Sequence, residues 1–404
     1  MKGFRLVLAV LVALVVLGSG VAVAQQDDSG SGSSEAPSEA TIAPNGEIPA
    51  DRTASSRTFE LPGDKLETRL YQAPVNYAAA GGWRPIGERF HLEGSAVTNG
   101  ANDLDVSLPK QIDVEPARVS VGDSWVASEM TSAEAEPVQL EGDTATYDAA
   151  NATVSFNYTG LSNGLKEDIE LASLADPSTF SFELSAASGL TPSLEEGGAV
   201  AFRDEHGDLV ALLPPPVMSD SAGTESRAVR YELGEESEGH WTLMLRADPQ
   251  WLAQPQRSFP VAIDPTITTG PPYGCVIGGH KGETGWIDCA SWGRTTFLTG
   301  YTPKLNSAED NWWRTLMNFE TEAVPPTAEV SSAIFRIRST ETAQNTKGVE
   351  LRKVTKPWTW QASWSRYDGP EHLWSTEGGD YSELLGEVLT ANRGNQAGWW
   401  EFSL

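Results

Sequence analysis

The sequence predicts an all-β fold, and three observations lead to this class. Apolar and polar residues alternate in several short segments, as they do in strands with one buried face. Such segments recur about every ten residues, with turn residues between them. No long window shows the ~3.6-residue period of an amphipathic helix. Together these patterns favour a β-sandwich or an open sheet.

Residues 1–24 have the pattern of a secretory signal peptide. Two basic residues precede an unbroken apolar run at 6–17, and small residues lead to an expected cleavage site between Ala24 and Gln25. An uncleaved membrane anchor is the alternative, but the run is shorter than the roughly 20 residues that span a bilayer. We therefore expect a secreted, extracellular protein with no membrane contact after cleavage.

Residues 25–56 are predicted to be a disordered linker, and residues 57–265 an acidic β-rich domain. The linker has no aromatic residue and is rich in Ser, Pro, Gly, Ala and acids, so it has little apolar surface to bury. In the domain, residues 154–158 alternate as a strand does, and residues 200–213 form a hairpin pattern around a Gly-containing turn. The Asp-Pro pair at 264–265 ends the last expected strand and sets the boundary.

The net charge of -28 comes from 56 acidic and 28 basic residues and is unevenly distributed. Residues 25–265 hold 40 acidic and 14 basic residues, a net of -26, whereas residues 266–404 hold 16 and 12, a net of -4. An excess of negative charge keeps a protein soluble and repels phosphate groups and anionic lipids. We therefore expect no nucleic acid among the partners.

The two cysteines, Cys275 and Cys289, are expected to form one disulfide. In an exported protein such a pair oxidises, and closing a loop of this length is worth roughly 3 kcal/mol in the chain-entropy model. A zinc site that includes His280 is the alternative, but a fourth ligand at close spacing is missing.

Residues 266–404 are rich in tryptophan, because ten of the 14 Trp lie between Trp286 and Trp400. Flat aromatic side chains complement the apolar faces of sugar rings. The candidate carbohydrate-binding residues are Trp358, Trp360, Trp364 and Trp374. The alternative is that these rings fill the core of a sandwich.

No catalytic constellation stands out, so we assign no catalytic residue and expect no enzymatic activity. The five His are scattered, and no H-E-x-x-H, G-x-S-x-G or P-loop pattern occurs. The sequence Asp204-Glu205-His206 lies in the expected hairpin turn, where polar residues are common. Gly378-Gly379-Asp380 resembles part of a calcium loop but supplies no ligand set by itself. We therefore expect no cofactor, with calcium as an open alternative.

Two groups of motifs resemble known bacterial families. The first pairs Leu-Tyr-Gln-Ala-Pro-Val-Asn-Tyr at 70–77 and Gly-Trp-Arg-Pro-Ile at 82–86 with residues 259–267, and it is similar to the N-terminal β-rich region of secreted RHS/YD-repeat and wall-associated proteins. The second resembles the DNRLRE-type domain, also called carbohydrate-binding module family 96. Its motifs lie at residues 314–319, 330–337, 354–359, 362–364, 374–380 and 398–402.

The second resemblance implies that residues 266–404 form a jelly-roll β-sandwich that binds carbohydrate. The hexapeptide that gives that family its name is absent, and the last strand of the family pattern has no counterpart before Leu404. We therefore expect an incomplete sandwich and a longer parent chain. The resulting hypothesis is a secreted, non-enzymatic surface protein from a toxin-delivery chain, with a polysaccharide or the cell wall as its partner. The alternatives are a structural adhesin or shell segment without glycan binding, and a polysaccharide-active enzyme in residues 57–265.

Overall fold

The computed structural model describes most of the chain from residue 46 onward, together with a short segment near the start. The described residues are 5–10, 46–112, 115–131, 134–150, 153–195, 197–237, 239–270, 273–280, 289, 297, 299–302, 311–339, 348–369, 371–389 and 398–404. Within them nearly all regular structure is strand, and the helical elements are η2 (Pro49–Asp51) and α1 (Pro249–Leu252). The all-β prediction is confirmed. In this described part of the chain, no helix has the length and apolar character needed to cross a membrane.

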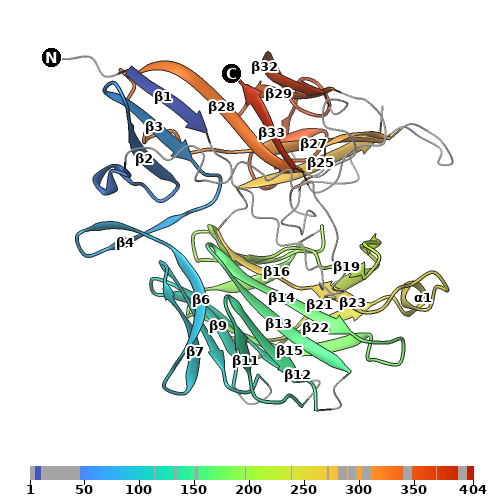
Figure 1. The fold of residues 1–404 in the computed structure, drawn as a ribbon. Coiled ribbons are helices and arrows are strands. Elements are labelled where there is room, and N and C mark those ends of the chain that lie inside the picture. The colour runs from blue at the N-terminus through green and yellow to red at the C-terminus, as the bar shows by residue number, and fades with distance from the viewer. Residues whose placement is uncertain are drawn as a thin grey trace, which may run out of the picture.

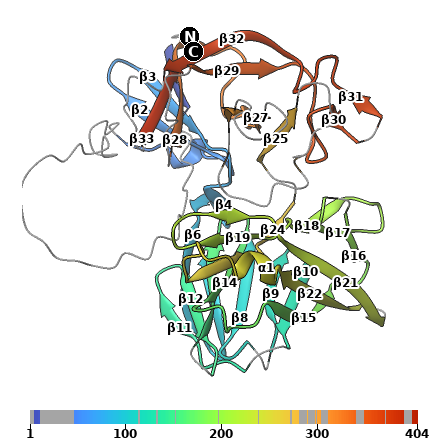
Figure 2. The same cartoon turned by 90° about the vertical axis from the view of Figure 1, so that its right-hand side faces the viewer.

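The strands form two bodies that lie one above the other in both views (Figures 1 and 2). The lower body comprises residues 87–269 and consists of two large sheets. In the described residues, its first sheet has eight strands in the order β21-β22-β15-β10-β9-β8-β7-β6. These strands are β6 (Gly87–Glu93), β7 (Ala96–Ala101), β8 (Leu104–Pro109), β9 (Ala117–Val121), β10 (Ser124–Met130), β15 (Thr179–Ala186), β21 (Val229–Ser237) and β22 (His240–Ala247).

The second sheet of the lower body is also antiparallel. Its main row runs β11-β12-β13-β14-β24-β18-β17-β16, and β23, β19 and β20 extend it beside β14. These strands are β11 (Gln139–Glu141), β12 (Thr144–Asp148), β13 (Val154–Leu161), β14 (Gly164–Leu171), β16 (Thr191–Leu194), β17 (Val200–Arg203), β18 (Leu209–Leu213), β19 (Val217–Asp220), β20 (Glu225–Ser226), β23 (Val261–Asp264) and β24 (Ile267–Thr269).

The core of the lower body lies between these two sheets, as the alternation in the sequence predicts. Strand β13 alternates buried and half-buried residues along its whole length, so one face points into the core. Phe156 of this strand meets Phe180 of the other sheet edge to face, with ring centroids 6.1 Å apart. Burying each such ring stabilises the fold by about 1.5–3 kcal/mol.

The predicted hairpin at 200–213 is present as β17 and β18. The carboxylate of Asp204 accepts hydrogen bonds from the backbone amides of His206 and Asp208, each at 2.9 Å. These bonds close the turn and lower the pKa of Asp204. The polar run around His206 is therefore turn chemistry, as the sequence indicates.

The upper body combines residues 5–10 and 46–70 with the described residues after 273. In Figure 1 its strands lie above those of the lower body. Strand β25 pairs with β27, which pairs with β26, while β28 pairs with β33 and β29 with β32. The bounds are β25 (Gly274–His280), β26 (Gly300–Thr302), β27 (Asn311–Met317), β28 (Glu329–Ser339), β29 (Gly348–Val354), β30 (Arg366–Asp368), β31 (His372–Leu373), β32 (Tyr381–Leu389) and β33 (Gly398–Ser403).

The division between the two bodies differs from the boundary expected near residue 265. Strand β24 follows that boundary but completes the lower body by pairing with β14 and β18. Strands β2 (Ser56–Leu61) and β3 (Lys65–Leu70) lie before it but belong to the sheet that contains β28 and β33. The hairpin of β4 (Asn76–Ala79) and β5 (Gly82–Pro85) leads from the upper body to the lower. Local patterns mark strands but not their partners, which explains the difference.

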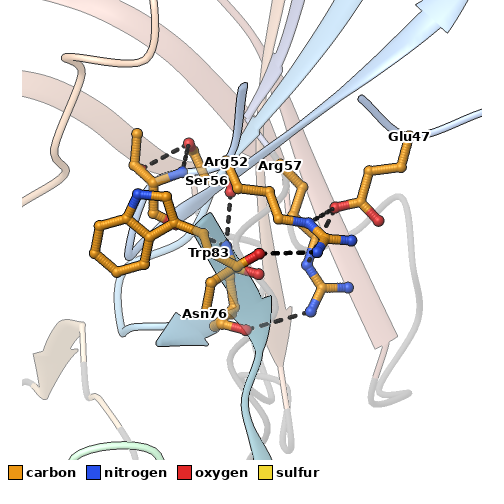
Figure 3. A network of polar contacts seen from close by, with 8 residues as sticks. Glu47, Arg52, Ser56, Arg57, Asn76 and Trp83 are labelled. Atoms are coloured by element: carbon orange, nitrogen blue, oxygen red, sulfur yellow. Dashed lines mark hydrogen bonds and ion pairs between the residues drawn. The ribbon is translucent and has the colours of Figure 1, made fainter. Parts of the chain in front are cut away.

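The N-terminal segments also differ from expectation. Residues 46–56, expected as linker, are packed, because Glu47 forms ion pairs with Arg52 and Arg57 (Figure 3). The backbone amide of Ile48 also donates to the carbonyl of Thr58 at 2.8 Å. Within the expected signal peptide, β1 (Arg5–Val10) lies between β3 and β28 and runs parallel to both. The cleavage site at Ala24–Gln25 lies outside the described residues and stays a prediction.

Candidate functional site

The four tryptophans singled out from the sequence are all buried. Their exposed fractions are 8% for Trp358, 9% for Trp360, 5% for Trp364 and 6% for Trp374. Three of them, all except Trp360, share one core cluster of the upper body. The structure therefore brings most of the group together, but in a core and not on a surface where a sugar ring could stack.

Within that core, Trp364 packs closely against two glycines. A Cβ atom added to Gly279 would lie 2.3 Å from the ring of Trp364, and one added to Gly378 would lie 2.7 Å from it, so the ring fits only between two glycines. The guanidinium of Arg314 lies 5.2 Å from the ring centroid and donates to the carbonyl of Gly378 at 2.6 Å.

Trp360 has a different environment, at the contact between the two bodies. The guanidinium of Arg203, on β17 of the lower body, lies 5.2 Å from its ring centroid. Arg203 also forms an ion pair with Glu195, with 3.3 Å between Nη2 and Oε1. This ring therefore helps to join the bodies.

The predicted disulfide between Cys275 and Cys289 is present, and both residues are buried in the same core cluster as Trp364. The backbone amide of Cys289 donates to the carbonyl of Ala362 at 2.8 Å, which ties the disulfide to the tryptophan segment. Because both sulfur atoms are used, the zinc alternative has no thiolate ligands here.

The calcium alternative at Asp380 is not supported by the geometry. The carboxylate of Asp380 accepts from the amides of Ser375 and Thr376, at 2.9 and 2.8 Å, and lies 3.4 Å from Lys356 Nζ. These donors lower the pKa of Asp380 and occupy the oxygens that a cation would need. In the described part of the chain, no three His, Cys, Asp or Glu residues lie close enough together to hold a metal ion.

The most unusual chemistry in the described residues lies in the lower body and was missed from the sequence. It is a buried group that we call the Glu167 cluster, made of Glu167, Tyr158, Tyr231, Lys166, Asp168 and Asp264. Glu167 faces the core from β14 between Leu165 and Ile169, where the alternation calls for an apolar residue. A carboxylate at a position of the strand that should be apolar was the one sign in the sequence that could have pointed to this cluster.

Within the cluster, Glu167 has a hydrogen-bond partner across the strand pair. Tyr158 on β13 lies directly opposite, and its hydroxyl donates to Glu167 Oε1 at 2.9 Å. Burial raises the pKa of the Glu167 carboxyl to about 8, the hydrogen bond from Tyr158 opposes this shift, and the charges of Asp168 and Asp264 add to it. Glu167 therefore holds a proton at neutral pH.

The remaining members surround this carboxyl. Lys166 and Asp168 point away from the core, where Lys166 forms an ion pair with Asp168 and lies 3.8 Å from Asp264 Oδ2. Burial would lower the pKa of Lys166, but the two carboxylates hold it above its usual range. The buried hydroxyl of Tyr231 has no hydrogen-bond partner in the described residues, and burial raises its pKa, helped by the charges of Asp264 and Glu167.

Comparison with known proteins gives partial matches only. The chain is 36% identical over 123 residues to the tRNA nuclease WapA of Bacillus subtilis (strain 168). The same identity over the same length links it to the tRNA(Glu)-specific nuclease WapA of Bacillus subtilis subsp. natto and to the tRNA3(Ser)-specific nuclease WapA of Bacillus spizizenii. Each match covers 29% of this chain and 5% of the relative, so the matched region is a small part of the relatives' length. No family model and no solved structure matches the chain.

These matches overturn the function inferred from the sequence. That inference was a non-enzymatic surface protein with a carbohydrate-binding sandwich, with an adhesin or a polysaccharide-active enzyme as alternatives. The matched proteins are named for cleavage of tRNA and not for contact with a polysaccharide. The burial of the candidate tryptophans gives the physical reason why the aromatic pattern misled: the bulky rings fill a core.

Proposed function

We propose that this chain is a section of a large secreted protein of the toxin-delivery type that is related to tRNA nucleases. The observation that carries this proposal is the 36% identity over 123 residues to three proteins named as such nucleases. The motifs at 70–86 and 259–267, which are similar to RHS/YD-repeat and wall-associated proteins, favour the same context. We also propose that this larger protein is associated with the cell wall and that residues 266–404 form a DNRLRE-type domain.

Within such a protein, the chain serves as a β-scaffold and does not itself cleave tRNA. Nuclease centres combine acid–base or metal-binding side chains with cations that hold phosphates. The described residues gather no metal-binding trio, and residues 25–265 carry a net charge of -26 that repels a polyanion. The Glu167 carboxyl lies under an apolar cover that would exclude a tRNA backbone.

The proposal is tested by separating scaffold from nuclease. The purified chain, the complete parent protein and the parent lacking residues 46–404 are each incubated with total bacterial tRNA, and cleavage is read on a denaturing gel. We expect cleavage by the parent and by the shortened parent, and none by the chain alone. Cleavage by the chain alone would refute the scaffold role.

A second measurement tests the delivery context. Recipient bacteria are exposed to cells that express the complete or the shortened parent, and recipient growth is followed. We expect growth inhibition only with the complete parent, because the shortened parent keeps its nuclease activity but lacks the scaffold needed for delivery. Equal inhibition by both would show that this section has no part in delivery.

A further inference from the structure

The lower body contains a small cavity beside Glu167. On the eight-stranded sheet, the small residues Ala117 and Ser128 are cross-strand neighbours. They line the same cavity as Tyr158 and Glu167 of the opposite sheet. The cavity measures about 40 Å³. Its other walls are apolar side chains from both sheets, among them Val126 and Phe182 on one side and Leu165 and Ile267 on the other.

We propose that Glu167 is a proton-operated latch: protonated, it lets the two sheets of the lower body close over this cavity, and its ionisation loosens them. The cavity is too small for an organic ligand, but it has room for roughly two or three water molecules. These few waters cannot complete the hydration shell of an ionised carboxylate, so any further water would have to part the apolar walls around it. The inference concerns the lower body alone and does not depend on the tRNA-nuclease context.

The groups that face Glu167 leave its charge uncompensated. On its own strand, Lys166 is engaged with Asp168 and Asp264 on the other face of the sheet. From β13 comes the neutral hydroxyl of Tyr158, whose ring meets that of Tyr147 on β12. From β21 comes the hydroxyl of Tyr231, which has no hydrogen-bond partner among the described residues, and β23 contributes the carboxylate of Asp264. An ionised Glu167 would therefore meet two neutral hydroxyls, of which Tyr158 donates to it, and the like charges of Asp168 and Asp264.

The direction of the pH effect follows from linkage. The pKa of Glu167 is about 8 in the folded protein and near its ordinary 4.5 when unfolded. A raised carboxyl pKa means that the folded state binds more protons between these values, so stability is full at low pH and falls as the pH rises toward 8. From pH 6 to pH 8 the folding equilibrium constant should fall about 50-fold through this group.

The test is hydrogen–deuterium exchange of the full chain between pH 6 and 9, read on peptides from β13 and β14 and corrected for intrinsic exchange rates. We expect protection in these strands to fall about 50-fold between pH 6 and 8. The variant Glu167→Gln keeps the shape without the titration and should lose most of this pH dependence. The small remainder comes from Asp168, because burial raises the pKa of its carboxyl to about 6. Glu129→Gln, which removes a partly exposed carboxylate from neighbouring β10, should behave as wild type.

Two outcomes would overturn the proposal. The first is a wild-type protein whose β14 peptides keep their protection across this pH range, a result that needs no variant. The second is a Glu167→Gln variant with the same pH dependence as wild type. If Glu167→Gln does not fold, Tyr158→Phe replaces it: loss of the donor to the carboxylate should move the transition to higher pH, and an unmoved transition counts against the latch.

Discussion

A buried ion pair between Arg257 and Asp220 should be among the most sensitive points of the lower body. Arg257 Nη1 lies 2.6 Å from Asp220 Oδ2, with side-chain exposures of 3% and 0%. Asp220 also accepts from the amides of Ala222 and Thr224, at 3.1 and 2.7 Å, and the guanidinium lies 3.7 Å from the ring centroid of Trp251. The pair thereby joins the turn after β19 to the segment that follows α1.

The informative change is Arg257→Met, because methionine keeps an apolar contact with Trp251 and removes only the charge and its donors. Asp220 would remain as a buried carboxylate without its counter-ion. Breaking a buried pair from one side lowers the free energy of unfolding by about 3–5 kcal/mol. Of a typical total of about 5–15 kcal/mol, this is a large fraction.

The assay is urea unfolding at pH 7, followed by tryptophan fluorescence. The matched control is Arg230→Met, since Arg230 forms a pair of similar length, 2.9 Å, with Glu232 but is 65% exposed. Exposed pairs are worth about 0–1 kcal/mol, so the control should lose less than 1 kcal/mol. If Arg257→Met destabilises the protein no more than Arg230→Met does, with unchanged denaturant slopes, the reasoning from burial is wrong.

Three further predictions concern the upper body. Gly279→Ala should destabilise it and change its tryptophan fluorescence, because the new Cβ would lie 2.3 Å from the ring of Trp364; Gly234→Ala, where the nearest atom is 3.9 Å away, should not. Replacing both cysteines by serine should lower the free energy of unfolding by roughly 3 kcal/mol, measured under oxidising conditions; an unchanged midpoint would contradict it. Asp380→Asn should loosen its turn at neutral pH, seen as faster amide exchange at residues 375–380. Because the pKa of Asp380 is lowered on folding, its contribution is present above the ordinary value of 3.8 and is lost as the pH falls through the folded value, so equal exchange in both proteins at pH 7 would refute it.

The alternation of apolar and polar residues was enough to predict the fold class and the hairpin of β17 and β18. It could not predict which strands are neighbours, because partners such as β14 and β24 are far apart in sequence and no local pattern encodes them. This is why the chain does not divide at residue 265.

The candidate site shows the same limit at the level of side chains. Of the four tryptophans chosen from the sequence, three share one core and Trp360 lies apart from them. Alternation does not say whether a face meets solvent or another sheet, so the pattern could not tell a core from a binding surface. Glu167 was missed for the opposite reason: one carboxylate in a β segment looks like a surface residue until its cross-strand partner, Tyr158, and the facing sheet are placed around it.

Two buried carboxylates of the lower body respond to pH in opposite directions, and together they predict an optimum. The surrounding amides and Arg257 hold the pKa of Asp220 below its ordinary value despite its burial, so its contribution is present above pH 3.8 and is lost as the pH falls through the folded value. Glu167 contributes in the opposite sense, and its stabilisation fades as the pH rises toward 8. The stability of this body should therefore be greatest in mildly acidic solution, between the two transitions. Because each transition belongs to a different residue, Glu167→Gln should flatten only the alkaline side of the profile and Asp220→Asn only the acidic side. A profile that both variants flatten on the same side would show that the two groups are not independent.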